Sequence, residues 1–416
     1  MPFEPLFVPP ALAAATGDGG WLQAMLDFEA ALARAQGLDE PAPPRLDAAE
    51  IAAAGRSAAN PAAALVEALE EPYAHQGATS QDVMDTAAVL VTKRALPLIE
   101  DELAGVAAAC AGLAAEHRDT PMAARTLLQQ ALPTTFGLKA AGWLVAVDEA
   151  RDLLASVPLE VELGGAAGTL ASLGDEGLGV LARLAAELDL AEPVLPWHTR
   201  RVRVGQLGSA LALTAGALEK IALDLKLLAQ TEVGEVAESS EGGRGGSSTL
   251  PHKRNPVGAT LTIACAHGVR GAASVLIGAI AQEHERAAGA WQAEWEALSR
   301  ALALTGGAAA SLREALEGLS VFPDRMRSNL ELTGGLLMTE AVSTALAHRL
   351  GRVEAKNVVA AAAHRAATGE RPLRDELIES ADLSAEEVDR ALDPANYLGS
   401  ASAFVDRALK AHEERR

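Results

Sequence analysis

Apolar side chains recur every three or four residues over long proline-free stretches of this chain. Between Pro196 and Pro251 the steps alternate between four and three, at Leu207, Leu211, Thr214, Leu218, Ile221, Leu225 and Leu228. This spacing places the apolar side chains along one face of a helix. It predicts a helix from about Arg203 to Glu238, on the order of 50 Å long at 1.5 Å per residue.

Three further stretches have the same helical texture. One runs from Val257 to Phe322, with expected interruptions near the sequence AGAW and at Gly306 and Gly307. The others run from about Pro133 to Leu154 and from about Val83 to His117, where Pro97 is expected to kink the helix. Long helices cannot bury an apolar face alone, so the pattern predicts an all-α fold with a long central helical bundle that forms oligomers.

The ends of the chain differ from the middle. Short helical patterns separated by proline-rich turns fill the first part, and short helices punctuated by TGERP and DPANYLG fill the last. We therefore predict an N-terminal helical domain at residues 1–85, the central long-helix bundle at 86–345 and a C-terminal helical cap at 346–416.

Composition limits the partners of the protein. Aromatic residues make up only 3% of the chain and the net charge is -21, so the surface should repel nucleic acid and anionic lipid. Any anion that binds therefore needs a local cationic pocket. We expect no nucleic-acid partner and no membrane association.

Two cysteines and the N-terminal residues suggest a cytoplasmic protein. Cys110 and Cys265 lie in apolar helical contexts typical of packed thiols in a reducing compartment. The first ten residues, MPFEPLFVPP, lack the basic start and apolar core of a secretory signal. The longest apolar run has 11 residues, too few to span a bilayer.

Several common site chemistries do not fit the sequence. The segment ELGGAAGTLASLG does not match a dinucleotide-binding loop, because position 163 is leucine and no strand-helix-strand pattern surrounds it. No two histidines have helical ligand spacing and the two cysteines lie far apart, so no metal site is expected.

The stretch GGRGGSSTLPHKRNP, from Gly242 to Pro256, combines features of an anion-binding loop. Its glycines allow close approach of the backbone to a ligand. Serine hydroxyls, backbone amides and the side chains of His252, Lys253 and Arg254 supply donors just before a predicted helix. The alternative from composition alone is a solvated loop between two helices.

The sequence of this loop resembles the GSSxMPxKxNP signature of the fumarase/aspartase superfamily, with Leu250 in place of methionine. Two more stretches resemble motifs of that superfamily in the same order. HQGATSQDVMDTA, at residues 75–87, resembles its TSxD region, and RTLLQQALPTTFG, at residues 125–137, resembles its RTHxQxAxPxTxG region. The chain is therefore identified as similar to this superfamily over nearly its whole length.

The resemblance implies a homotetramer built around long helices, with each active site shared between subunits. It implies that Ser247 transfers a proton at carbon, and that Lys253 takes part in catalysis by binding a carboxylate. It implies no cofactor. Its predicted substrate contacts include His75, Thr79, Ser80, Gln129, Ser248 and Asn255.

Leu127 departs from the superfamily pattern, which has histidine there. In the adenylosuccinate lyase branch, that histidine protonates a departing nitrogen, and an alkyl side chain cannot transfer a proton. A carboxylate leaving group, whose conjugate acid has a pKa of about 4, can depart unprotonated. We therefore expect lactone chemistry, as in the 3-carboxy-cis,cis-muconate cycloisomerases, which the sequences PWHTRR and EHERAAGAWQAEW also resemble.

A substrate with three carboxylates requires several cations. The candidates are Arg125, His198, Arg200, Arg201, Arg254 and Arg286, and of these we predict Arg125, His198 and Arg201 as substrate contacts. The alternative for each is a solvated or interhelical charge. Trp291 and Trp295 are interpreted as packing anchors, and Met84 and Met338 as core.

Two other functions stay open from the sequence. One is another elimination enzyme of the superfamily, such as an adenylosuccinate lyase that uses His75 or His198 as its acid. The other is a structural homologue without activity, against which the intact Ser247, Lys253 and Asn255 argue.

Overall fold

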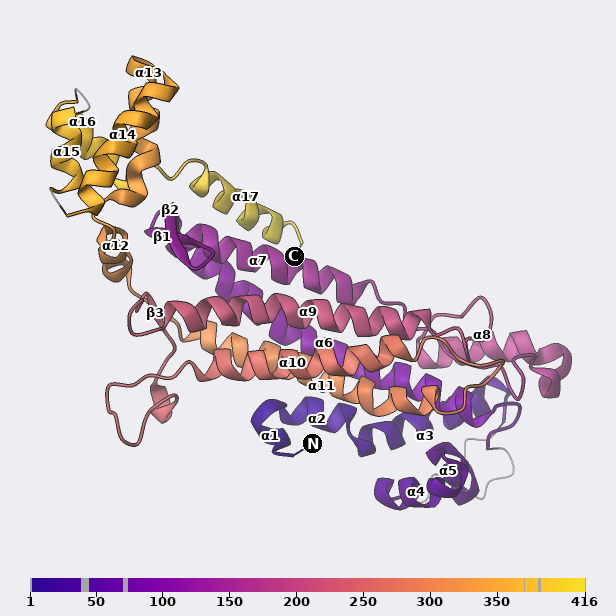
Figure 1. Cartoon of the computed structure of the whole chain (residues 1–416). Coiled ribbons are helices and arrows are strands. Elements are labelled where there is room, and N and C mark those ends of the chain that lie inside the picture. Colours follow the sequence, from indigo (N-terminus) through magenta and orange to yellow (C-terminus); the bar gives the residue numbers. More distant parts are fainter. Residues whose placement is uncertain (1, 39–44, 70–73, 370, 381–382, 416) are drawn as a thin grey trace. The chain divides into compact units, whose positions relative to one another are not determined.

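The computed structural model describes residues 2–38, 45–69, 74–369, 371–380 and 383–415, and it is built almost entirely from helices (Figure 1). The predicted all-α class is confirmed. The helices are α1 (Glu4–Phe7), α2 (Pro10–Thr16), α3 (Asp18–Ala35), α4 (Ala48–Ala54), α5 (Pro61–Leu69), α6 (Ser80–Glu116), α7 (Phe136–Ala155), α8 (Gly177–Leu188), α9 (Val202–Leu228), α10 (Val257–Gly278), α11 (Ala290–Glu317), α12 (Pro323–Glu331), α13 (Thr339–Leu350), α14 (Arg352–Ala367), α15 (Leu373–Ser380), α16 (Ala385–Leu392) and α17 (Ala401–Glu413). The strands are β1 (Pro121–Thr126), β2 (Gln129–Thr135), β3 (Val236–Ala237) and β4 (Ser320–Val321).

The helix predicted over 203–238 is shorter than expected, because α9 ends at Leu228. Beyond it the chain turns through Gly234, whose φ is +61°, a left-handed value that glycine adopts readily. Val236 then pairs antiparallel with Val321, so β3 and β4 form a two-stranded ladder. Val236 and Ala237 therefore pair with β4 instead of continuing the helix, and the residues between are held by local turns such as that from the Glu235 amide to the Leu228 carbonyl.

Gly306 and Gly307 do not interrupt a helix, as the sequence had suggested, but lie inside α11. A Cβ atom at Gly307 would come within 1.9 Å of the carbonyl oxygen of Phe7, and one at Gly306 within 2.1 Å of a Leu12 methyl group. The two glycines therefore allow the N-terminal segment to pack directly against α11.

A β-hairpin that the sequence did not predict precedes α7. β1 and β2 pair antiparallel from Pro121 opposite Thr135 to Thr126 opposite Gln129. Leu127 and Leu128 form the turn, with φ values of +50° and +66°. Two-residue hairpin turns favour such left-handed values, which are costly for leucine. The predicted helix from Pro133 therefore begins only at Phe136.

The chain divides into two compact units, and both contain parts of the long helices. The first unit comprises residues 1–105, 149–222 and 258–314. Within it α6, α9, α10 and α11 run as long neighbouring helices (Figure 1). Added Cβ atoms at Gly208 and Gly268 would meet Leu276 and Leu304 at 3.1 and 2.4 Å, so these helices pack closely. The predicted boundary at 85/86 falls inside α6.

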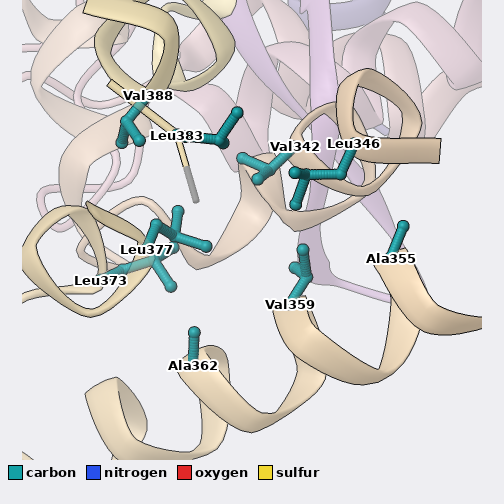
Figure 2. Packing of buried hydrophobic residues seen from close by; sticks show 9 residues of the cluster. All are labelled: Val342, Leu346, Ala355, Val359, Ala362, Leu373, Leu377, Leu383 and Val388. Atoms are coloured by element: carbon teal, nitrogen blue, oxygen red, sulfur yellow. The ribbon is translucent and has the colours of Figure 1, made fainter. Parts of the chain in front are cut away.

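The second unit comprises residues 106–148, 223–257 and 315–416. Its C-terminal helices α13 to α16 enclose an apolar cluster, shown in Figure 2. The members are Val342, Leu346, Ala355, Val359, Ala362, Leu373, Leu377, Leu383 and Val388. The boundary predicted at 345/346 falls inside α13. Residues on both sides of it, Val342 and Leu346, belong to the same cluster.

The side chains predicted as core are packed. Met84 and Met338 are buried, and Trp291 is buried with its ring 4.9 Å from that of Trp295 in an edge-to-face contact. Both cysteines are buried free thiols. Burial raises the pKa of Cys265 to about 11, which keeps this thiol protonated at neutral pH.

Among the described helices, α10 is long and apolar enough to cross a membrane by length and composition. The core helix of a soluble protein passes the same test, so length and composition do not by themselves indicate a membrane span.

Candidate functional site

In the first unit, the TSxD region forms the start of α6. The carboxylate of Asp82 accepts hydrogen bonds from the backbone amide of Thr79 at 2.8 Å and from the amides of Gly164 and Gly165 at 2.9 and 3.0 Å. The amide of Asp82 in turn donates to the carbonyl of Thr79. Asp82 therefore caps the helix and fixes Thr79 and Ser80 against the loop at 164–165.

His198 and Glu162 complete this cluster, and all three side chains are buried. His198 Nε2 lies 2.6 Å from Asp82 Oδ1 and 3.4 Å from Glu162 Oε1. The amide of Trp197 donates to Glu162 Oε2 at 2.6 Å. Burial, followed by the negative charges of Asp82 and Asp85, raises the pKa of Glu162 well above its usual range.

Asp82, Glu162 and His198 are the described residues whose ligand atoms lie close enough to share a metal ion, within 4.8 Å of one another. However, Asp82 already accepts from three backbone amides and lies within hydrogen-bond distance of His198. These four contacts use the lone pairs that a metal would need. The geometry therefore favours a hydrogen-bonded helix cap over a metal centre.

The raised pKa of Glu162 predicts a specific pH dependence of stability. The folded protein keeps the Glu162 proton above pH ~4.3, where an unfolded chain loses it. The stability that Glu162 contributes is therefore complete below that pH and is lost as the pH rises through its folded pKa. Glu162→Gln removes this titration. We expect the unfolding free energy of the variant, relative to the wild type, to rise by up to about 1.4 kcal/mol per pH unit in this window.

Thermal or urea unfolding of both proteins from pH 4 to pH 8 measures this difference. Glu219→Gln is the matched control, because hydrogen bonding to Arg270 lowers the pKa of Glu219. Its stability relative to the wild type should change with the opposite sign, and only at low pH: it falls as the pH rises from the lowered folded pKa to ~4.3. Above about pH 5, where Glu162→Gln should still gain, the difference for Glu219→Gln should be constant. A pH-independent difference for Glu162→Gln would contradict the assignment.

Arg201 is held by two carboxylates and is only 2% exposed. Its Nη1 and Nη2 atoms donate to Asp85 at 2.7 and 2.9 Å, and its Nε donates to Glu294 at 3.1 Å. Burial opposes the charge, but Asp85 and Glu294 hold the pKa of Arg201 above its usual range. This geometry favours the interhelical role for Arg201 over the predicted substrate contact, since its donors are already used.

His75 lies five residues before α6, with φ at +61°. The buried carboxylate of Glu29, on α3, accepts from the backbone amide of His75 at 2.8 Å and lies 2.8 Å from its ring Nδ1. The His75 side chain is 19% exposed. One carboxylate therefore fixes both the backbone and the ring of this residue.

In the second unit, Arg125 projects from β1 to a buried carboxylate. Its Nη1 and Nη2 atoms donate to Glu235 at 2.9 and 2.7 Å, and Asn329 Nδ2 donates to the same carboxylate at 2.7 Å. Gln130, on β2, donates to the carbonyl of Asn329 at 2.8 Å. These contacts fix the hairpin that carries Gln129 and Leu127, and both of these side chains are exposed.

The signature loop is closed by a short set of hydrogen bonds. Asn255 donates through its amide at 2.8 Å and its side chain at 3.0 Å to the carbonyl of Gly245. Ser247 Oγ accepts from the amides of Thr249 and Leu250 at 3.3 and 3.1 Å. Lys253 is exposed. The loop thus presents a serine and a lysine just before α10 begins at Val257.

The predicted site residues fall in both units. His75, Thr79, Ser80, His198 and Arg201 belong to the first. The second contains the hairpin and the loop, with Arg125, Gln129, Ser247, Ser248, Lys253 and Asn255.

Three buried acids that position these residues were missed from the sequence. Asp82 stands in the TSxD motif, where its place three residues after a threonine signalled a helix cap. Glu29 and Glu235 carry no local signal, because their partners lie 46 and 110 residues away.

Comparison with known proteins identifies the relationship. A family model described as Lyase matches residues 48–271, and one described as Adenylosuccinate lyase C-terminus matches residues 335–408. The chain belongs to the fumarase/aspartase superfamily of lyases. It is 46% identical to 3-carboxy-cis,cis-muconate cycloisomerase from Pseudomonas aeruginosa, in an alignment covering 99% of this chain and 96% of the relative.

Two other relatives bear on the reaction: one is named for a different substrate and one has a solved structure. A nitrosuccinate lyase from Streptomyces davaonensis is also 46% identical, over 95% of this chain and 91% of its own length. The crystal structure of the 3-carboxy-cis,cis-muconate lactonizing enzyme from Pseudomonas putida matches with a TM-score of 0.93 and 44% identity, covering 99% of both chains.

Proposed function

We propose that this protein is a cycloisomerase that converts 3-carboxy-cis,cis-muconate to a carboxymuconolactone, a step in protocatechuate breakdown. One observation carries the proposal: the match to enzymes of that name extends over nearly the whole chain in both sequence and structure. The superfamily motifs lie within the matched length, so the similarity includes the regions expected to bind substrate.

Leu127 supports this reaction over an adenylosuccinate-type elimination. Its side chain is 97% exposed at the tip of the hairpin and has no ionisable group. A reaction whose leaving group departs as a stable anion needs no acid at this position. Lactone opening has a carboxylate leaving group, and lactone formation is the reverse of that step.

In the lactonising direction, one carboxylate oxygen of the substrate forms a bond to a carbon of its own diene. The electron pair displaced from the double bond moves toward another carboxylate, which becomes an aci-carboxylate. Ser247 then gives its proton to the adjacent carbon and is reprotonated from solvent. The substrate trianion takes up one proton and becomes a lactone with two carboxylates, so the two compounds are isomers when both are fully protonated. No redox partner or cofactor is needed.

The cations of the signature loop balance the charge that develops on the aci-carboxylate. Lys253 and Arg254 are both exposed in this loop, close in sequence to Ser247. Preorganised cations and amides stabilise such a charge and the serine oxygen. Because the whole chain has a net charge of -21, these local cations are important for holding an anionic substrate.

We further propose a cytoplasmic homotetramer with active sites shared between subunits. The long helices leave apolar side chains exposed, including Leu213 on α9 at 62% and Ile277 on α10 at 47%. Burial of such side chains against other copies of the chain would lower the free energy of the assembly.

A second candidate is nitrosuccinate elimination, because a nitrosuccinate lyase is as similar in sequence as the cycloisomerase. Nitrite, like a carboxylate, leaves as a stable anion, so Leu127 is compatible with both reactions. The same serine would then remove a proton from carbon instead of delivering one.

A direct assay separates these functions. We expect purified protein to remove the diene ultraviolet absorbance of 3-carboxy-cis,cis-muconate, and to leave adenylosuccinate unchanged under the same conditions. Nitrosuccinate is assayed in parallel by release of nitrite. A kcat/KM for nitrosuccinate or adenylosuccinate above that for the muconate would overturn the proposed function.

A further inference from the structure

The carboxylate of Glu29, on α3, contacts both the backbone amide and the ring of His75. We call this pair of contacts the clamp, and it determines which ring nitrogen of His75 carries the proton. Glu29 is 1% exposed, and its two oxygens each contact a different part of His75. Oε2 accepts from the backbone amide and Oε1 faces ring Nδ1, both at 2.8 Å. A carboxylate has no hydrogen to donate, so this contact requires a proton on Nδ1.

The backbone at His75 is strained, which shows that the clamp has a cost. A φ of +61° is a left-handed value that disfavours residues with a Cβ. Such strain persists only where surrounding contacts enforce it, and it occurs preferentially at functional positions. The hydrogen bond from the His75 amide to Glu29 is one such contact.

The clamp also fixes the start of the segment that leads into α6. The amide of Ala78 donates to the carbonyl of His75, and Gln36 donates to the carbonyl of Gln76 at 3.0 Å. Asp82 fixes the other end of this segment at Thr79. Two buried acids therefore hold the short turn between the predicted substrate contacts His75 and Thr79.

We infer that Glu29 is a positioning residue that fixes the neutral His75 ring as the Nδ1-H tautomer. The lone pair of Nε2 then faces away from the clamp, where it can accept a hydrogen bond or a proton at the substrate site. This inference rests on the proposed function for the identity of the substrate, but the tautomer itself does not depend on it. Carboxylates that orient metal-bound histidines change activity about 10- to 100-fold when they are mutated, and we expect an effect of that order for Glu29.

Glu29→Gln tests the inference with almost no change in shape. The glutamine oxygen can still accept from the His75 amide, which leaves its NH₂ group facing Nδ1. That NH₂ group can only donate, so Nδ1 must become the acceptor and the proton moves to Nε2. We expect kcat/KM for the preferred substrate to fall by about tenfold or more.

A double-mutant cycle separates positioning from simple loss of structure. His75→Gln keeps a polar group near Nε2 but removes the ring. If Glu29 acts through His75, Glu29→Gln should cause no further loss of kcat/KM in the His75→Gln background. Equal fold losses in both backgrounds would overturn the inference. Asp27→Asn, on the same helix but paired with Arg94, is the control and should keep the wild-type kcat/KM.

Solid-state NMR of sedimented protein labelled with nitrogen-15 histidine provides a readout that needs no substrate. His75→Gln identifies the His75 signals by their loss. We expect a protonated Nδ1 in the wild type at a pH where the ring is neutral, and a protonated Nε2 in Glu29→Gln. A wild-type ring protonated on Nε2 alone would overturn the inference. Failure of the substrate assay with the expected tautomers would instead refute only the proposed function.

Discussion

Replacing Ser247 by alanine should lower kcat about 10²- to 10⁴-fold, the usual contribution of a positioned proton donor. In the proposed reaction Ser247 delivers the proton to carbon, and a methyl group cannot do so. The side chain is partly exposed in the signature loop and does not belong to the packed core. Helix content by circular dichroism and oligomer size by light scattering should therefore equal those of the wild type.

The variant also removes the acceptor for the amides of Thr249 and Leu250. Ser239→Ala controls for this effect, because Ser239 Oγ accepts a similar local hydrogen bond from the amide of Glu241 at 3.2 Å. We expect Ser239→Ala to keep a kcat within a few fold of the wild type. A Ser247→Ala enzyme with near-normal kcat would remove Ser247 from the mechanism.

Arg201→Met should destabilise the folded protein by about 3–5 kcal/mol, the usual cost of breaking a buried ion pair by removing one partner. Methionine fills much of the same volume but leaves Asp85 and Glu294 without their shared cation. Among the residues that the structure describes, Asp85 then keeps the Trp291 and Gln81 donors, at 3.0 and 3.1 Å. Urea unfolding at one fixed protein concentration measures the change, since an oligomer's stability depends on concentration.

Arg374→Met is the matched control. Arg374 also donates two hydrogen bonds to one carboxylate, that of Asp389, but both side chains are about half exposed. Exposed pairs contribute little because solvent screens them, so we expect the urea midpoint to be unchanged. If Arg201→Met unfolds at the wild-type midpoint but loses substrate affinity, the result would support the prediction from the sequence that Arg201 contacts the substrate.

The local sequence predicted the long helices well, because apolar spacing is a property of each segment alone. It placed the start of α10 directly after Pro256 and found the periodic face of α9. It failed where distant residues decide the local structure. Gly306 and Gly307 read as a helix interruption, since only the fold brings Phe7 and Leu12 against them.

For the candidate site, too, the sequence predicted local features but not contacts between distant residues. The sequence motifs identified the serine loop, the hairpin region and the TSxD region, because each motif is contiguous in the chain. It did not reveal that Leu127 and Leu128 form a strained turn, since neither residue is typical of left-handed backbone. Nor did it reveal which cations are free, because Arg125 and Arg201 look like any other arginine until their carboxylate partners are located.

The sequence by itself therefore determined the all-α class, the superfamily and the residues expected to carry the chemistry. The tertiary structure alone decided how these residues are held. Glu29 reaches His75 across 46 positions, and Glu235 reaches Arg125 across 110. The physical reason is that hydrogen bonds and ion pairs depend on distances in space. A buried acid is therefore recognised by the partner that satisfies it, and only the folded chain brings that partner within reach.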